Sequence, residues 1–431
     1  MRVLQISTSD RGGAGIAAVR LHLALLKEGV DSQLLTMYKL GEDIKEHYVF
    51  SPEDCKRFKL LYQCIYFFRA ILIRFNLYHL IHQKLEKKYL KNQAKGFEKF
   101  SFTSSLNKLE NHPLVRSADI INLHWVSDGF LDFNSFFSNC DKNIVWTLHD
   151  MNAFTGGCHH SDNCNGFIID CAKCPQLKNT LDDDIAKKTL EMKSTAIAKI
   201  RNNQLKIITP SHWLSEKSKS SKLFSKFNHT VIPNGIDPAI FFPQNKKESR
   251  KLFLFPDDKK IILFVSHNIN NPRKGINILI EAFNQLQIIN PNLLLCSVGS
   301  ISNELSSINN LIQLGYIKSD EQMAKLYAAA DVFVLPSLAE NFPNTICESL
   351  FCGTPVVAFN VGGVSEQVNN SNGFIVDKIN ATDLKDAIEK CLASYSSFNQ
   401  KTISADAVLQ FSGTSVAKKY REVYSKFEVK K

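Results

Sequence analysis

Two glutamates in the second half of the chain have the residue type and spacing needed to bind a phosphorylated sugar. We expect an apolar strand at 331–335 and a helix at 344–351. Glu340 lies between the two, and Glu348 lies within the helix. A helix start offers unpaired backbone N–H groups to a phosphate, and an ionised carboxylate accepts hydrogen bonds from neighbouring hydroxyls. We therefore expect a ligand that carries both a phosphate and a sugar, although a solvated acidic loop before an ordinary helix would show the same spacing.

A pair of cations, Arg273 and Lys274, lies where the strand expected at 261–265 gives way to a helix. Two fixed cations can neutralise the charge that develops on a departing diphosphate without a divalent metal. Alone, such a pair is usually surface charge. Because the same half of the chain carries Glu340 and Glu348, we expect both cations to contact the ligand.

Short apolar strands alternate with amphipathic helices, and this alternation predicts an α/β fold with parallel sheets. We expect strands at 3–7, 119–123, 143–148, 205–209, 230–232, 261–265, 293–298, 311–315, 331–335 and 356–359, and helices at 16–28, 182–201, 344–351, 382–392 and 414–429. A length of 431 residues exceeds what one core usually supports, so we expect two domains of about 200 residues each. The turn at Asn234-Gly235 and the polar stretch 243–251 place the boundary after residue 235.

The composition is that of an ordinary globular protein, with 44% hydrophobic and 22% charged residues. The net charge of +10 favours an anionic partner, either nucleic acid, a membrane surface or a phosphorylated substrate. Nothing resembles a zinc-finger, RNP or basic-zipper pattern, so we expect no nucleic-acid partner. No apolar run approaches the ~20 residues that span a bilayer, and the first residues do not form a signal peptide, so we expect a cytoplasmic protein.

The segment 56–95 interleaves aromatic and aliphatic residues with lysines and arginines. A basic helix with an apolar face can lie among lipid headgroups, which would suit an acceptor held at the inner face of the cytoplasmic membrane. The alternative is a helix that packs on its own lobe and presents a solvated basic face. The sequence leaves peripheral membrane contact and simple packing open.

Glycines and histidines follow expected strands of the first domain. Gly12, Gly13 and Gly15 come between a strand and a helix, where they either let backbone amides approach a phosphate or form a tight turn. His124 follows one strand, and His149-Asp150 follows another. Ligands bind beyond the carboxyl ends of parallel strands, so these side chains are candidates to orient an acceptor hydroxyl, the alternative being histidines that merely cap strands.

Four cysteines lie close together after Asp150, namely Cys158, Cys164, Cys171 and Cys174. Four thiolates could bind a structural zinc ion that fixes an otherwise unsupported polar loop. The spacings are looser than those of common zinc sites, so a disulfide pair and unligated thiols remain as alternatives. A catalytic metal is not expected here, because four thiolates leave no open coordination position. Most of the 11 cysteines are expected to stay reduced, because cytosolic thiol buffers keep them so.

Three motifs resemble those of glycosyltransferase family 4, a retaining, nucleotide-sugar-dependent family with the two-lobed GT-B fold. They are the Glu-x7-Glu signature from Glu340 to Glu348, the donor-phosphate clamp Arg273-Lys274-Gly275, and the interlobe element Pro233-Asn234-Gly235-Ile236-Asp237. The resemblance is firm over 206–375 and looser over 49–114. The loop 156–175 also resembles a Cys-rich loop of bacterial family 4 enzymes that synthesise surface polysaccharides such as capsule and lipopolysaccharide.

The resemblance implies two Rossmann-like lobes facing across a cleft: an acceptor-side lobe at 1–235, a nucleotide-sugar lobe at 236–412, and a last helix at 413–431 that returns to the first lobe. Glu348 would hold the ribose, Glu340 would face the transferred sugar, and His149 would lie at the donor–acceptor junction. Further donor contacts are expected at Gly12, Gly13, Gly15, Gly299, Asn344 and Thr345.

The expected function is transfer of a sugar from a nucleoside diphosphate sugar to a glycan or polyprenyl-linked glycan, with retention and without a catalytic metal or a protein nucleophile. One alternative is another phosphosugar enzyme of the same fold, such as an epimerase or a sucrose-phosphate-type synthase. A second is a zinc-dependent membrane scaffold with a decayed sugar-nucleotide cleft.

Overall fold

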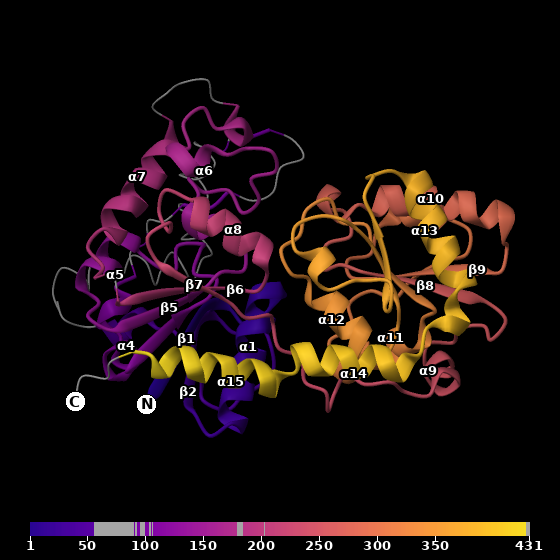
Figure 1. The fold of residues 1–431 in the computed structure, drawn as a ribbon, viewed down its shortest axis with the longest axis horizontal. Helices are drawn as coiled ribbons and strands as arrows, with labels where there is room; N and C mark the ends of the chain where they lie inside the picture. Colours follow the sequence, from indigo (N-terminus) through magenta and orange to yellow (C-terminus); the bar gives the residue numbers. More distant parts are fainter. Residues whose placement is uncertain are drawn as a thin grey trace.

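The computed structural model describes the chain except for residues 56–89, 91–92, 95–99, 103–104, 106, 179–183, 202 and 428–431. The described residues form two α/β lobes that lie side by side (Figure 1). The predicted basic amphipathic segment 56–95 lies almost entirely outside the described residues. Among the helices that are described, none combines the length and the apolar character that crossing a bilayer requires.

The first lobe is built on a parallel sheet with strand order β3-β2-β1-β4-β5-β6-β7. Its strands are β1 (Arg2–Ser9), β2 (Asp31–Tyr38), β3 (His47–Val49), β4 (Ile120–Leu123), β5 (Asn143–Thr147), β6 (Leu205–Thr209) and β7 (Asn228–Val231). The helices that accompany it are α1 (Gly12–Lys27), α4 (Pro113–Ser117), α5 (Phe133–Asn139), α6 (Gly166–Ile169), α7 (Ile185–Ile197) and α8 (His212–Ser220). The carboxyl ends of β1, β4 and β5 lie next to one another, so the residues that follow these strands share one edge of the sheet.

The second lobe repeats this plan with strand order β10-β9-β8-β11-β12-β13, again all parallel. Its strands are β8 (Lys260–Val265), β9 (Leu293–Val298), β10 (Leu311–Gln313), β11 (Val332–Leu335), β12 (Val356–Phe359) and β13 (Gly373–Val376). Its helices are α9 (Lys246–Leu252), α10 (Ile276–Ile289), α11 (Asp320–Ala329), α12 (Asn344–Phe351), α13 (Ala381–Ala393) and α14 (Gln400–Phe411). The predicted α/β fold class is confirmed.

The central strands of the second sheet are apolar throughout because helices cover both of its faces. Alternate residues point to opposite faces: Leu263 and Phe333 pack in the core formed with α11, α12 and α14, whereas Ile262 and Val334 pack in the core formed with α10 and α13. Figure 1 shows the two helix groups on either side of this sheet. The edge of the sheet is therefore the part left for a ligand.

The last helix, α15 (Gly413–Ser425), follows α14 and packs against α1 of the first lobe (Figure 1). Val416, Tyr420 and Tyr424 join a core with Val3 and Leu21. The chain thus crosses between the lobes twice, once before β8 and once between α14 and α15.

The starts of two helices differ by more than one residue from the sequence prediction. Helix α1 begins at Gly12 rather than at residue 16, so Gly12, Gly13 and Gly15 form its first turn instead of a preceding loop. A Cβ atom on Gly15 would lie 2.4 Å from the Ser9 carbonyl oxygen, which explains why glycine is needed where α1 leaves β1. Helix α7 begins late because the Asp184 side chain accepts the Lys187 N–H and caps it.

Ion pairs join α1 to the second lobe and to the segment between the lobes. Arg20 donates to Glu348 Oε1 at 2.7 Å and to Asp320 Oδ2 at 3.0 Å. Lys27 pairs with Asp237 at 2.6 Å. The side chains of Arg20 and Glu348 are 11% and 10% exposed, against 62% for Lys27, so only the first pair is shielded from water.

Replacing Gly15 with alanine should lower the melting temperature, because overpacking against fixed backbone costs about 1–3 kcal/mol. The matched control is Gly13→Ala, in the same turn, where a Cβ would meet nothing within 4 Å. Differential scanning calorimetry measures the melting temperatures of both variants. Equal melting temperatures would show that the close approach of α1 to Ser9 does not require glycine at position 15.

Arg20→Met should destabilise the protein by about 3 kcal/mol, because it leaves the Glu348 carboxylate buried without its cation. Lys27→Met is the control, with an expected cost below about 1 kcal/mol for an exposed pair. Thermal unfolding of both variants measures the difference. A loss for Lys27→Met as large as that for Arg20→Met would contradict the assignment of the shielded pair as the stronger interlobe contact.

Candidate functional site

The structure brings Arg273, Lys274 and Glu340 together at the carboxyl ends of β8 and β11. Lys274 Nζ lies 2.6 Å from Glu340 Oε1, and the Arg273 guanidinium lies 3.3 Å from the same oxygen. The Arg273 guanidinium also donates to the Ala339 carbonyl oxygen at 2.5 Å. Three of the predicted catalytic residues therefore form one cluster.

A side-chain cap and a glycine fix the backbone around this cluster. Arg273 and Lys274 lie in a short 3-10 turn (Pro272–Lys274), and the Asn271 side chain accepts the Arg273 N–H at 2.9 Å. The turn ends at Gly275, whose φ is +69° and whose Cβ, if present, would lie 1.9 Å from the Pro336 carbonyl oxygen. Glycine at 275 thus lets the cation turn approach the end of β11.

Electrostatics keep Glu340 ionised. Burial alone would raise the pKa of the Glu340 carboxyl, but Lys274 and then Arg273 outweigh it and lower the pKa to about 2. Two cations and one carboxylate leave the cluster with one net positive charge. Such a site suits a diphosphate, whose anionic oxygens are bound by fixed cations.

Glu348 lies apart from this cluster in α12, and its two carboxylate oxygens already have partners. Oε1 accepts the Arg20 guanidinium, and Oε2 accepts the Tyr327 hydroxyl at 3.0 Å. The carboxylate is held by one group from each lobe. A ribose at Glu348 would use the remaining lone pairs of these oxygens or displace one of the two donors.

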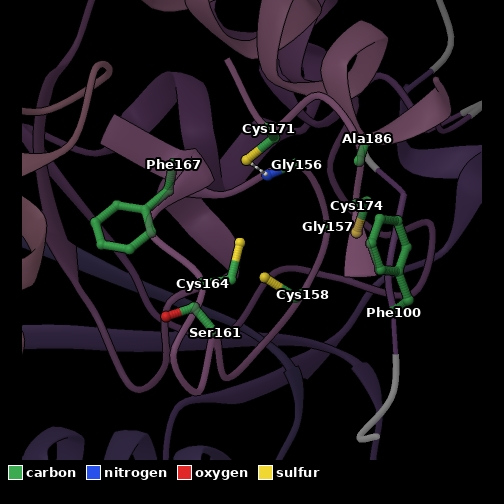
Figure 2. Close-up of a pocket in the computed structure, with 10 residues that line it drawn as sticks. All are labelled: Phe100, Gly156, Gly157, Cys158, Ser161, Cys164, Phe167, Cys171, Cys174 and Ala186. Carbon is green, nitrogen blue, oxygen red and sulfur yellow. Dashed lines mark hydrogen bonds between the residues drawn. The ribbon is translucent and has the colours of Figure 1, made fainter. Parts of the chain in front are cut away.

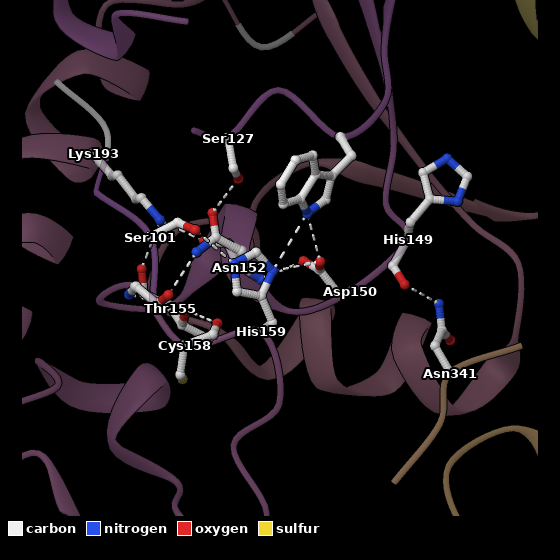
Figure 3. Close-up of polar contacts among 12 residues, drawn as sticks. Ser101, Ser127, His149, Asp150, Asn152, Thr155, Cys158, His159, Lys193 and Asn341 are labelled. Atoms are coloured by element: carbon white, nitrogen blue, oxygen red, sulfur yellow. Dashed lines mark hydrogen bonds and ion pairs between the residues drawn. The ribbon is translucent and has the colours of Figure 1, made fainter. Parts of the chain in front are cut away.

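The loop that carries Glu340 also reaches the first lobe. Asn341 accepts the Ser211 hydroxyl at 2.7 Å and donates to the His149 carbonyl oxygen at 3.0 Å (Figure 3). Gly363 donates its N–H to the Asn341 carbonyl oxygen at 3.0 Å. Asn341, the residue after Glu340, therefore links the loop that carries this carboxylate to His149 of the other lobe.

His149 and His124 lie edge to edge, with ring centroids 5.2 Å apart, an angle of 20° between the ring planes, and His149 Nε2 2.9 Å from His124 Nδ1. The other nitrogen of His124, Nε2, lies 2.9 Å from Gln5 Oε1. Burial lowers the pKa of His149 to about 4, and burial followed by the proximity of His149 lowers the pKa of His124. Both rings are consequently neutral at neutral pH.

The hydrogen-bond network assigns the tautomers of this pair. Asn122 Nδ2 donates to Gln5 Oε1 at 2.9 Å, so that oxygen is an acceptor and His124 Nε2 must carry a proton. His124 Nδ1 is then an acceptor, and His149 Nε2 must donate to it. This leaves the lone pair on His149 Nδ1 available to accept a hydrogen bond. Tyr424 of α15 supports the network by accepting from Asn122 Nδ2 at 3.1 Å.

Asp150, His149 and His124 line one small pocket at the carboxyl ends of β4 and β5. Both oxygens of the Asp150 carboxylate have hydrogen-bond partners (Figure 3). Oδ2 lies 2.6 Å from His159 Nδ1 and accepts from Trp125 Nε1 at 2.9 Å. Oδ1 accepts the Asn152 N–H at 2.8 Å. Burial would raise the pKa of Asp150, but His159 lowers it to about 2. Asp150 therefore shapes the pocket wall.

The remaining predicted donor contacts fall into two places. The Gly13 carbonyl oxygen accepts from Asn344 Nδ2 at 3.1 Å, which joins the first turn of α1 to that of α12. Thr345 is half-buried in the same turn of α12, and Gly12 precedes Gly13 with open space beside its Cα. Gly299, at φ +135°, lets the loops after β8 and β9 nearly touch, because a Cβ there would lie 1.7 Å from the Ser266 carbonyl oxygen.

Sequence reasoning missed three features of this region. Arg20 of the first lobe donates to Glu348 of the second. Its position on an amphipathic helix gave no indication of this contact in the sequence. His160 is near enough to Arg273 for that cation, after burial, to contribute to lowering the pKa of His160 to about 4. The exposed Tyr316 ring lies 5.1 Å from the His267 ring, and its hydroxyl donates to the His267 carbonyl oxygen at 2.8 Å. Ring side chains after β8 and β10, the two strands that flank β9, were the available signal.

The four clustered cysteines line a separate cavity of the first lobe (Figure 2). Every cysteine that the structure describes is a free thiol. As the described side chains stand, no group of three His, Cys, Asp or Glu residues is arranged to hold a metal ion.

Comparison with known proteins agrees with this architecture. A family model described as "Glycosyl transferases group 1" matches residues 245–405, which contain the Arg273–Lys274–Glu340 cluster and Glu348. The chain is 23% identical over 394 residues to the putative colanic acid biosynthesis glycosyl transferase WcaC of Escherichia coli strain K12, and the match covers 88% of each protein.

Two solved structures share the whole fold. Sucrose-phosphate synthase from Thermosynechococcus elongatus superposes with a TM-score of 0.63 at 18% identity, covering 99% of each chain. Anabaena HepE in complex with UDP-glucose superposes with a TM-score of 0.61 at 17% identity, covering 99% of this chain and 100% of HepE. With the group 1 match and the full-length relative, these similarities identify the chain as a glycosyltransferase with the GT-B fold.

Proposed function

We propose that the protein is a retaining enzyme that transfers a sugar from a nucleoside diphosphate sugar to a glycan or lipid-linked glycan of a surface polysaccharide. The observation that carries this proposal is the contact from Glu340, through Asn341, to His149, which puts a cationic donor site beside a polar pocket in the other lobe. The relative WcaC is described by its role in colanic acid biosynthesis, and HepE was solved with UDP-glucose; both support this substrate class.

On the donor side, Lys274 and Arg273 bind the diphosphate and stabilise the charge that it gains as the sugar departs. This charge stabilisation needs no catalytic metal. Glu348 holds the ribose together with Arg20, Gly12 to Gly15 and Thr345 line the approach to the diphosphate, and the loops at Gly299 and Tyr316 hold the base. Glu340, fixed by its two cations, faces the transferred sugar.

On the acceptor side, His149 Nδ1 accepts a hydrogen bond from the attacking hydroxyl. A histidine whose pKa is about 4 is a poor general base at neutral pH, so His149 orients the hydroxyl rather than retaining its proton. The acceptor oxygen bonds to the anomeric carbon on the face from which the phosphate leaves, the bond from that carbon to the phosphate oxygen breaks, and the proton passes to the departing phosphate. Retention follows without a protein nucleophile.

Lys274→Met should lower kcat with a nucleotide-sugar donor by about a hundredfold or more, as expected for removal of a group that stabilises developing charge. Lys251→Met, in the exposed face of α9, is the matched control and should retain wild-type kcat. Products are measured by mass spectrometry, and the anomeric configuration by NMR. An inverted product would refute retention, and wild-type activity of Lys274→Met would refute the donor site.

His124→Phe should reduce kcat by about tenfold or more while leaving the donor KM unchanged, because His149 loses the partner that fixes its tautomer. His229→Asn, a histidine bonded to Ser218 far along the first sheet, is the control. Nitrogen-15 NMR of the histidine rings shows which ring nitrogen is protonated, which a loss of stability alone would not change. In the wild type, the His149 proton should be on Nε2. A proton on Nδ1 would contradict the assignment.

A further inference from the structure

The four cysteines of the first lobe line one cavity, although they come from separate parts of a loop. Cys158, Cys164, Cys171 and Cys174 line a cavity of about 20 Å³ (Figure 2), which is room for about one water molecule or one ion. Phe100 and Phe167 are also part of its lining. Thiols that served only as apolar packing would not need a shared void at their centre.

Backbone amides already point at two of the sulfur atoms. The Gly156 N–H donates to Cys171 Sγ at 3.2 Å, and the Gly166 N–H donates to Cys164 Sγ at 3.4 Å. Such donors stabilise the charge of a thiolate. In the Cys171–Cys174 turn, Cys171 and Lys173 have φ values of 57° and 54°, a left-handed conformation that costs free energy in residues other than glycine. The turn therefore needs a compensating interaction.

A buried cation lies beside the cluster. Lys193 is 0% exposed, and its ammonium donates to the carbonyl oxygens of Asn152 and Thr155. Within the described part of the chain, no carboxylate forms an ion pair with it. Burial disfavours the charge of Lys193 and lowers its pKa to about 8, whereas a negative charge on Cys171 or Cys158 would favour the protonated form. A divalent ion bound by four thiolates is an anion overall, and it would neutralise this lysine.

We propose that Cys158, Cys164, Cys171 and Cys174 bind one zinc ion as four thiolates. The side chains must rotate inward to reach Zn–S distances of about 2.3 Å, and neutral thiols have no attraction that would draw them together. Four thiolates complete a tetrahedral shell, so the ion is structural rather than catalytic. Disulfide bonds would leave the charge of Lys193 uncompensated.

The ion would brace the acceptor-side wall of the active site. Thr155 donates its hydroxyl to the Cys158 carbonyl oxygen at 2.6 Å, and Asn152 donates to the Gly157 carbonyl oxygen at 2.7 Å. Asn152 in turn donates its N–H to Asp150, next to His149. The loop that carries the four cysteines is thus tied by hydrogen bonds to the residue that follows the candidate acceptor histidine.

The test is metal analysis of the purified full-length protein, and it does not depend on glycosyl transfer. Plasma mass spectrometry should find one zinc per chain, and a mercurial that titrates thiols should release it. Cys174→Ser should retain less than about a tenth of the zinc, whereas the control Cys140→Ser should retain all of it. Replacement with Co²⁺ should give thiolate-to-cobalt charge-transfer absorption.

Removal of the zinc with a chelator should lower the melting temperature of the wild type by at least about 5 °C, and added zinc should restore it. This measurement keeps the proposal falsifiable if Cys174→Ser does not fold. Lys193→Met should weaken zinc binding about tenfold in competition with a chromophoric chelator. Wild-type protein without metal, a disulfide between any two of the four cysteines, or full zinc content in Cys174→Ser would overturn the proposal.

Discussion

The burial of the Glu340 carboxylate is the constraint on which the rest of the site depends. A carboxylate that is removed from water must be paired with a cation, and here Lys274 and Arg273 fulfil that requirement from a turn in a different part of the lobe. The pairing fixes the end of β11 against the end of β8. It also consumes only one of two positive charges, so the same interaction that stabilises the loop leaves a cationic surface for an anionic ligand.

Charge pairing across the lobes follows the same rule but serves a different purpose. Arg20 of α1 is shielded together with Glu348, and each charge would lose this partner if the lobes separated. Separation therefore requires both groups to regain water or another partner. A hydroxyl-rich ligand at Glu348, as we propose, would supply such a partner for the carboxylate, and its binding would then affect how strongly the lobes are held together.

Much of the fold could be predicted from sequence because parallel strands covered on both faces are apolar throughout, and 205–209, 293–298 and 356–359 were predicted with the boundaries that the structure has. The cation–glutamate cluster was equally accessible, since each residue lies in the segment that joins a strand to the next α-helix. The predicted start of α1 was wrong. Three glycines close together in the sequence suggest a loop, whereas in the structure the close approach of Gly15 to Ser9 favours a helix that begins at Gly12. The partners of Glu348 and the Gln5–His124–His149 chain join residues far apart in sequence, and no local pattern encodes them.

The histidine chain shows why such non-local contacts matter for function. A neutral histidine can accept a hydrogen bond at either nitrogen, and burial alone does not choose between them. Gln5 makes that choice for His124, and its own amide orientation is set by Asn122 and by Tyr424 of the last helix. The return of α15 to the first lobe thus bears on which nitrogen of His149 carries the proton. A helix far along the sequence helps to set the direction of a hydrogen-bond network that ends at the candidate acceptor histidine.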